Sequence, residues 1–177
     1  GGKRMSSALQ TMFSRAFAVT WLFAGLVDSA SSADSPNPAH MFGAHTVGSS
    51  LADVRQYRTS ENCIIEKDNA DCSFIDLNGV RYVVLDKSVI AVVAQTESAS
   101  SKLGLPYGLK FGDSLEAAIR KLVSVGDDPW LVGTDHEGGV AVSSYKQYSG
   151  KNGVKFNVGL QFTKDKLVEV KYNSGTI

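Results

Sequence analysis

Three histidines are the side chains of this 177-residue chain best suited to acid–base or metal chemistry. His40 lies in a proline-containing stretch, His45 precedes a helical pattern, and His136 lies between Asp135 and Glu137. Adjacent residues of a turn point in different directions, and no Gly-x-Ser-x-Gly elbow supplies a serine nucleophile. We therefore expect no catalytic residues, and we interpret the segment around His136 as a polar loop.

Two other motifs contain residues that bind ions in proteins, but they lack the required spacing. Asp127 and Asp128 precede Pro129 without the twelve-residue pattern of a calcium loop, and a helix exit with a proline stop explains them. The glycines of 104–108 and 138–139 do not join a parallel strand to a helix, as a phosphate loop requires. The sequence therefore predicts no metal site and no cofactor.

Cys63 and Cys72 are the only cysteines of the chain. An even cysteine count in an oxidising compartment indicates a disulfide, here closing a loop of about ten residues that stabilises the fold by about 2 to 3 kcal/mol. Metal binding is the alternative, but two sulfurs without a nearby histidine do not complete a tetrahedral site. We expect a Cys63–Cys72 bridge.

Residues 1–33 have the three parts of a cleavable secretory signal. The apolar run 16–27 follows basic residues and precedes small residues that end at Ala33. At about 1.5 Å per residue the run spans roughly 18 Å, too short for a bilayer core of about 30 Å. We expect cleavage after Ala33 and a periplasmic protein with no permanent membrane anchor, since no cysteine lies near the cleavage site. The basic residues are Lys3, Arg4 and Arg15.

The residues around this signal complete the predicted organisation. Residues 1–4 precede Met5 and indicate a cloning remnant or an upstream extension, whereas residues 34–41 contain two prolines and no periodicity, which is typical of a linker. A buried N-terminal helix is the alternative for residues 1–33. Beyond the linker we expect one domain of two units, 42–100 and 101–177.

Charge and composition exclude one class of function. The chain has 18 basic and 18 acidic residues, and loss of the signal removes more basic than acidic side chains. Nucleic-acid binding requires a basic surplus on one face, which this balance does not provide. With 43% hydrophobic residues, the chain has enough apolar side chains for a globular core.

The hydrophobic pattern predicts a short helix and then an antiparallel meander in each unit. In the first unit Ser49 or Ser50 caps a helix that carries Leu51 and Val54 on one face. In the second unit Asp113 caps a helix whose Glu116 completes a capping box. The expected strands are 63–65, 72–76, 80–85, 88–96, 138–148, 154–163 and 167–172.

The two units resemble each other in sequence. VGSSLADV at 47–54 and FGDSLEAA at 111–118 share a glycine, a serine and a leucine at equal offsets. We interpret this match as an internal duplication. The predicted fold class is therefore α+β: two similar units, each a short helix packed on an antiparallel β-meander, forming one sheet-bearing domain.

Strand 154–163 indicates where a partner would bind. Its residues alternate between apolar and polar, so that one face packs on helices and the other meets solvent, whereas 89–94 is apolar on both faces and predicts a central strand covered by a further layer. Aromatic side chains dominate binding hot spots, although Trp130 could instead cap the core. The candidate partner-binding residues are Trp130, Tyr145, Tyr148, Lys155, Asn157 and Gln161.

The glycine-led helix starts resemble a known superfamily. The segments 45–49 and 109–113, each opening a short helix before a meander, are similar to the BamE-like and beta-lactamase-inhibitory-protein-like proteins. The resemblance implies two units whose sheets form a concave binding surface, and Cys63 and Cys72 match the short disulfide loop of an inhibitor unit. The methionine that often follows the glycine is Ser49 or Asp113 here.

Together these observations predict a non-enzymatic periplasmic protein-binding module. We expect an inhibitor or immunity-type protein that blocks a periplasmic or secreted enzyme with an exposed sheet face. The alternatives are a cell-envelope assembly or maintenance factor, as the BamE-like half of the resemblance implies, and a small-ligand carrier or hydrolase, which would need titratable groups converging in a pocket.

Overall fold

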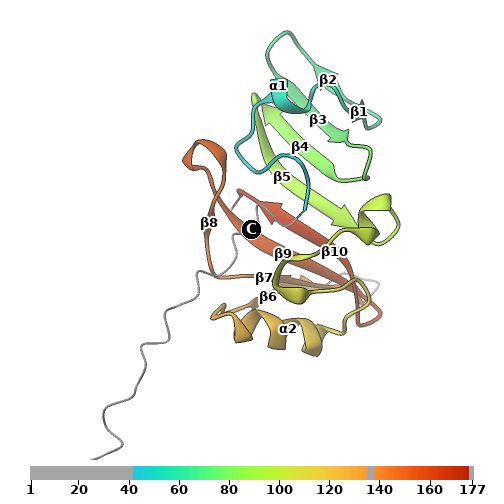
Figure 1. Ribbon diagram of the computed structural model, residues 1–177, viewed down its shortest axis with the longest axis vertical. Coiled ribbons are helices and arrows are strands. Elements are labelled where there is room, and N and C mark those ends of the chain that lie inside the picture. Colours follow the sequence, from blue (N-terminus) through green and yellow to red (C-terminus); the bar gives the residue numbers. More distant parts are fainter. Residues whose placement is uncertain (1–41, 135–137, 176–177) are drawn as a thin grey trace, which may run out of the picture. The chain divides into compact units, whose positions relative to one another are not determined.

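A computed structural model describes residues 42–134 and 138–175 (Figure 1). The predicted signal at 1–33 and linker at 34–41, with His40, lie outside the described residues, as does the segment 135–137 that contains His136. In the described part of the chain, no helix is long and apolar enough to cross a membrane.

Strands dominate the described residues. The helical elements are α1 (Leu51–Val54), α2 (Leu115–Ser124) and the short 3-10 turns η2 (Ala99–Lys102), η3 (Pro106–Gly108) and η4 (Lys151–Gly153). The strands are β1 (Arg58–Thr59), β2 (Ile64–Ile65), β3 (Ala70–Ile75), β4 (Arg81–Asp86), β5 (Ser88–Gln95), β6 (Trp130–Thr134), β7 (Val140–Ser143), β8 (Tyr148–Ser149), β9 (Lys155–Thr163) and β10 (Lys166–Asn173).

All ten strands belong to one antiparallel sheet. The order is β1-β3-β4-β5-β10-β9-β7-β6, with β2 added to β3 and β8 to β9, and the central strands lie side by side in Figure 1. The prediction of two helix-and-meander units is therefore wrong. The sheet is continuous, and α1 is a single turn of four residues, so α2 is the only helix of substantial length among the described residues.

The pairing of β5 with β10 makes the sheet continuous. Five consecutive residue pairs join the two strands, from Glu169 opposite Gln95 to Asn173 opposite Ala91. This contact could not be predicted from the two meanders, because each meander pairs only strands that are neighbours in the chain. As a result, one hydrophobic core extends under strands from both halves.

That core lies on a single face of the sheet. Strand β9 alternates as predicted, with Phe156, Val158, Leu160 and Phe162 buried and the residues between them more exposed. The buried residues of both α-helices belong to the same cluster as these side chains. The burial of apolar side chains in such a core is the main contribution that stabilises a small domain. The core residues of α1 and α2 are Leu51, Val54, Ala118 and Leu122.

Two segments differ from their predicted secondary structure. The predicted strand 138–148 is broken after Ser143, because Ser144 uses its side chain to bond the Lys146 carbonyl and the chain turns away. No strand was predicted after the helix exit at Asp127 and Asp128, but the edge strand β6 lies there, and its Trp130 pairs with Ser143.

Helix α2 begins one residue later than predicted. Ser114 is its N-cap and accepts the N–H of Ala117 at 3.2 Å, whereas Asp113 accepts the N–H of Lys110 at 2.8 Å and pairs with Lys121 Nζ at 2.7 Å. At α1, Ser50 is the N-cap and forms a capping box with Asp53. The capping box predicted for Asp113 and Glu116 is therefore wrong: Ser114 caps α2, Asp165 Oδ1 accepts the N–H of Leu115 at 3.0 Å, and a capping box is found instead in the first half.

The part that repeats between the two halves is a turn. Gly48 and Gly112 are the third residues of two β-turns, with φ of +85° and +88°, a position that favours glycine. Each glycine N–H donates to a strand carbonyl, Gly48 to Val89 at 2.8 Å and Gly112 to Leu167 at 2.9 Å. In return, each strand N–H donates at 2.8 Å to the residue after the glycine. The sequence match thus reflects a shared turn that is fastened to a strand.

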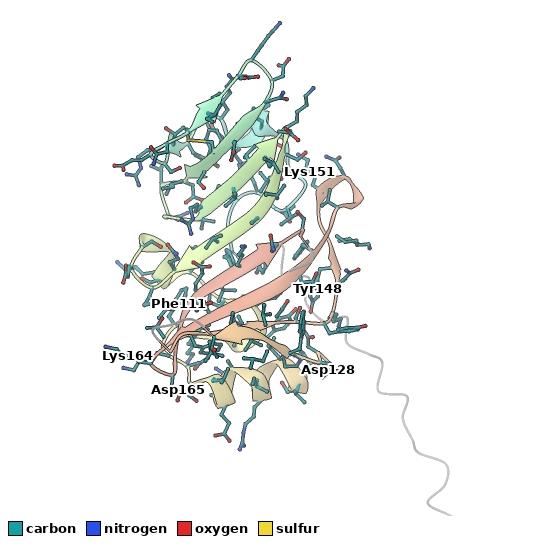
Figure 2. All side chains as sticks on the ribbon, turned by 180° about the vertical axis from the view of Figure 1, so that it is seen from behind. Phe111, Asp128, Tyr148, Lys151, Lys164 and Asp165 are labelled. Carbon is teal, nitrogen blue, oxygen red and sulfur yellow. A yellow bond between two sulfur atoms is a disulfide. The ribbon has the colours of Figure 1, made fainter. Side chains whose placement is uncertain are left out.

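The first of these turns also contacts the β8–β9 loop. Lys151 N donates to the Val47 carbonyl at 2.8 Å, and Lys151 Nζ lies 2.9 Å from Asp53 Oδ2 (Figure 2). The Lys151 hydrogen bond, together with those from Ser50, lowers the pKa of Asp53 to about 2. The backbones approach so closely that a Cβ on Gly48 would lie 2.0 Å from the Lys151 carbonyl oxygen. Position 48 therefore accommodates only glycine.

The predicted disulfide is confirmed. Cys63 and Cys72 are bonded, with their Cα atoms 4.6 Å apart, and no described cysteine is free. The bridge ties the segment around β2 to the buried face of β3, where Cys72 lies in the core. A disulfide is a feature of proteins that fold in an oxidising compartment, so it fits an exported protein.

We predict that Gly48→Ala destabilises the fold much more than Gly112→Ala. Both changes place a Cβ at positive φ, which costs about 1 to 2 kcal/mol. Only Gly48 would also clash with a neighbouring backbone, since nothing lies within 4 Å of a Cβ on Gly112. Urea unfolding should therefore show an additional loss of at least about 2 kcal/mol for Gly48→Ala. Equal losses for the two variants would contradict the close approach of Gly48 and Lys151.

Candidate binding face

The face of the sheet opposite the core, here called the open face, has a row of residues that crosses all eight strands of the main path. Residues directly opposite each other in paired strands share a face, so the pairings define the row one strand at a time. We call it the central row. It consists of Arg58, Ile75, Arg81, Val93, Lys171, Gly159, Ser143 and Trp130.

No described helix packs on the open face. Val92 and Ala94 belong to the core cluster together with the helical side chains, whereas their neighbours Ala91 and Val93 point the other way and are outside that cluster. Residues from η3 and from both α-helices all contribute to the core side. The open face is therefore the sheet surface that the described part of the chain leaves uncovered.

Side chains, and not a second layer, bury the centre of strand β5. Arg81 on β4 reaches across β5 to Glu169 on β10, with 3.8 Å between Nη2 and Oε2. Val93 pairs with both Arg81 and Lys171, and its exposed fraction is only 2%. Contrary to the prediction, no further layer covers 89–94 on this side of the sheet among the described residues. The apolar residues on both faces of β5 are explained by the long polar side chains that span it.

The central row is positively charged. It contains Arg58, Arg81 and Lys171 and no acidic residue. The nearest acid on the face, Glu169, is bound both by Arg81 and by Gln95, whose Nε2 donates to Oε2 at 2.5 Å. Lys171 forms no ion pair within 4 Å in the described residues. The face therefore keeps cationic side chains whose charge an acidic partner would complement.

Three of the predicted partner-binding residues lie on the open face. Trp130 ends the central row with 47% of its surface exposed. Asn157 and Gln161 point to the same side from β9, and Asn157 Nδ2 donates to the Ser144 carbonyl at 2.9 Å. Alternation along strand β9 was the signal that placed Asn157 and Gln161 correctly.

The other three predicted residues lie elsewhere or are occupied. Tyr148 is buried and its hydroxyl is hydrogen-bonded to that of Tyr107, so it is not available to a partner. Burial raises the pKa of Tyr148. Tyr145, which follows β7, is 75% exposed. Lys155 is exposed at the start of β9, and its Nζ donates to Ser149 Oγ at 2.5 Å.

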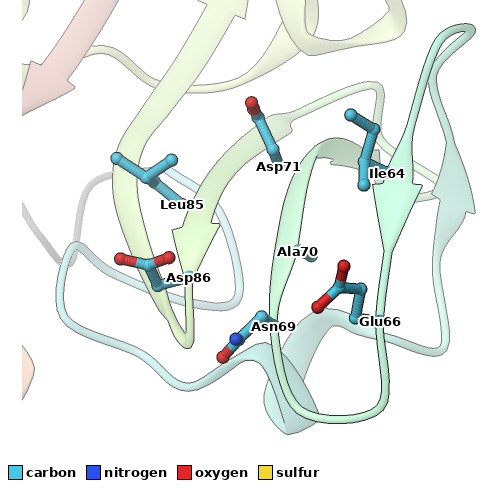
Figure 3. A pocket seen from close by; sticks show the side chains of 7 residues that line it. All are labelled: Ile64, Glu66, Asn69, Ala70, Asp71, Leu85 and Asp86. Carbon is cyan, nitrogen blue, oxygen red and sulfur yellow. The ribbon is translucent and has the colours of Figure 1, made fainter.

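A shallow hollow of about 370 Å³ at the β1–β3 edge is lined by Gln56, Tyr57, Arg58, Ile75, Asp76 and Leu77. Two smaller pockets lie near the ends of other strands on this sheet. One, of about 330 Å³, is lined by Gln95, Thr96, Glu97, Gln161, Val168 and Glu169. The other, of about 190 Å³, lies at the β2–β3–β4 corner, where the carboxylates of Glu66, Asp71 and Asp86 surround it together with two exposed aliphatic side chains (Figure 3). Both are open hollows, and neither encloses a small molecule as a typical ligand site does.

The titratable residues singled out in the sequence have structural contacts. His45 Nε2 lies 2.9 Å from the Tyr57 hydroxyl. Asp127 is buried and its Oδ1 accepts the N–H groups of Asp128, Tyr145 and Lys146 at 2.8 to 3.3 Å, which holds the loops before β6 and after β7 together. Within residues 42–134 and 138–175, no three His, Cys, Asp or Glu side chains are placed to hold a metal ion.

Sequence analysis missed the cationic centre of the face. Arg81 and Lys171 lie 90 positions apart in the numbering and become neighbours across Val93 only through the β5–β10 register. The sequence did contain one indication of this site at Gly159, because a glycine in the interior of a strand such as β9 often marks a place where another backbone or a ligand approaches closely.

In comparisons with known proteins, no family model, no curated protein and no solved structure matches the chain.

We predict that Tyr148→Ala destabilises the fold much more than Tyr145→Ala. Removal of the buried Tyr148 ring should cost about 3 to 5 kcal/mol, as for other core aromatics. The exposed Tyr145 ring should cost no more than about 0.5 kcal/mol. Thermal unfolding followed by circular dichroism distinguishes the two. A Tyr148→Ala variant as stable as Tyr145→Ala would contradict the burial of Tyr148.

Proposed function

We propose that the chain is a non-catalytic, exported protein-binding module that uses the open face to block a periplasmic or secreted enzyme. The observation that carries this proposal is the central row: eight residues in line across an uncovered sheet, with cations at its centre and an exposed tryptophan at its end. Tryptophan and arginine are the residues most enriched at binding hot spots.

The dimensions of the face suit a protein partner. With strands about 4.8 Å apart, the central row is about 34 Å long, which matches the width of a standard interface patch of about 800 Å² per partner. The pockets on the sheet are shallow, so a small molecule would bury little of its surface in any of them. A long face with only shallow pockets supports a macromolecular partner over a small ligand.

The compartment and the type of partner rest on two further observations. The Cys63–Cys72 disulfide and the predicted signal at 1–33 both support export to the periplasm. The resemblance of the glycine-led turns to inhibitory proteins supports an enzyme as the partner. We therefore prefer an inhibitor or immunity-type role to one in envelope assembly.

Capture followed by an inhibition assay tests this proposal. The full chain is immobilised, exposed to periplasmic extract of its source organism, and the captured enzyme is purified and assayed. We expect the chain to inhibit it, and Trp130→Ala with Gln161→Ala to weaken inhibition by at least about tenfold. Arg120→Gln on α2, where the side chain pairs only with Glu116 at the surface, is the matched control and should inhibit normally.

Three results would refute the proposal. These are capture of outer-membrane assembly proteins only, an enzyme whose activity the bound chain leaves unchanged, and equal inhibition by the open-face double variant and the wild type. Circular dichroism of each variant establishes that the folds are intact, since Trp130 and Gln161 both lie outside the core cluster.

A further inference from the structure

We propose that the centre of the open face receives an acidic, protruding segment of the partner protein, with a carboxylate seated between Arg81 and Lys171 and the segment passing over Gly159 toward Trp130. This inference rests on the proposed function and names the chemistry of the partner. Four observations support it: Lys171 has no ion pair among the described residues, Arg81 extends across β5, Gly159 leaves space on β9, and the Trp130 indole is exposed.

The charge of the site is incompletely neutralised. Arg81 has one carboxylate neighbour, Glu169 at 3.8 Å, which Gln95 also binds. The Arg81 Nε is buried and has no hydrogen-bond partner. Lys171, two residues from Glu169, forms no ion pair within 4 Å in the described ranges. Of these two cations only Arg81 has a carboxylate within 4 Å among the described residues, and a second carboxylate would form charge-assisted hydrogen bonds with both.

The position of these cations favours one shared anion. Arg81 and Lys171 are both cross-strand partners of Val93, so their backbones lie two strand spacings apart, about 10 Å. Arg81 already extends over β5 toward the strand that carries Lys171. A carboxylate above Val93 would therefore be within reach of both side chains. The Arg81 side chain remains partly accessible, with 38% of it exposed, and Lys171 is half-buried.

Gly159 leaves an open space beside Arg81 and Lys171, although the fold would accept a larger residue at this position. Its φ is not in the left-handed region, and a Cβ there would meet the Lys171 backbone oxygen at 3.7 Å and the Lys171 Cβ at 4.0 Å, both ordinary contacts. A larger residue would fit the strand and would suit a β-strand better than glycine. The missing side chain instead lets another backbone approach the sheet between Lys171 and Ser143.

Trp130 bounds the other side of this space. It lies three strands from Lys171 in the central row, about 14 Å away at the usual spacing, with Gly159 and Ser143 between them. A protruding loop has about this width. An acidic residue of the loop would pair with the cations while an apolar neighbour packs against the indole, which is the usual arrangement of a hot spot with a polar contact beside it.

A peptide selection tests the chemistry of the site independently of any natural partner. The full chain is immobilised and presented with a phage-displayed library of disulfide-closed ten-residue peptides, and the enriched sequences are synthesised with a fluorescent label. We expect enrichment of Asp and Glu together with an aromatic residue. Binding measured by fluorescence anisotropy should fall by at least about tenfold in Lys171→Gln and in Gly159→Leu.

Matched controls separate a local effect from a change in folding. Arg120→Gln removes a cation from α2, and Gly104→Leu adds the same side chain at a loop glycine with no atom within 4 Å of its Cβ. Both should bind the labelled peptide within about twofold of the wild type. Thermal unfolding of Gly159→Leu should show a midpoint no lower than that of the wild type, as the side chain faces open space.

Enrichment of basic or neutral peptides, no enrichment at all, or acidic peptides that bind Lys171→Gln and Gly159→Leu normally would overturn the inference. Its failure is distinguishable from that of the proposed function. If Trp130→Ala with Gln161→Ala weakens inhibition of the captured enzyme while Lys171→Gln and Gly159→Leu inhibit normally, then the open face binds the partner but its centre is not the acidic site.

Discussion

The antiparallel pairing of β5 with β10 is the contact on which the rest of the structure depends. It joins the strands of the first half to those of the second, so that one core and one open face extend across the whole sheet. It also sets the register that places Arg81, Val93 and Lys171 in one line. A register shift of one residue would reverse the faces of a strand and would move Lys171 into the core. The proposed binding face is therefore a consequence of this single pairing.

The glycine-led turns hold the ends of this arrangement in place. Each turn is hydrogen-bonded to the start of the second strand of a hairpin, Val89 in β5 and Leu167 in β10, which are the two strands that pair at the centre. The first turn additionally receives the backbone of Lys151, and an ion pair between Lys151 and Asp53 reinforces that contact. Contacts between residues distant in sequence thus fix the starts of the two central strands, which lie at opposite ends of this antiparallel pair.

Local features of the fold were predictable from sequence, whereas its assembly was not. The alternation of β9 identified the buried residues from Phe156 to Phe162, and the serine before Leu51 identified a helix start, because both depend on neighbouring residues only. The division into two units failed, since no local pattern encodes that β5 pairs with β10. For the same reason Asn157 and Gln161 were placed on the exposed face correctly, while the cations at its centre were missed. Tyr148 was misjudged because its burial depends on a hydroxyl partner, Tyr107, from a separate loop.

Limited lysine acetylation with and without the captured enzyme tests the central claim most directly. Lys171 lies in the central row, whereas Lys110 is exposed at the turn that leads to α2, on the other side of the sheet. Mass spectrometry of the acetylated peptides should show that the complex slows modification of Lys171 by at least about tenfold and leaves Lys110 unchanged. Protection of Lys110 with no change at Lys171 would contradict the claim that the open face is the binding surface.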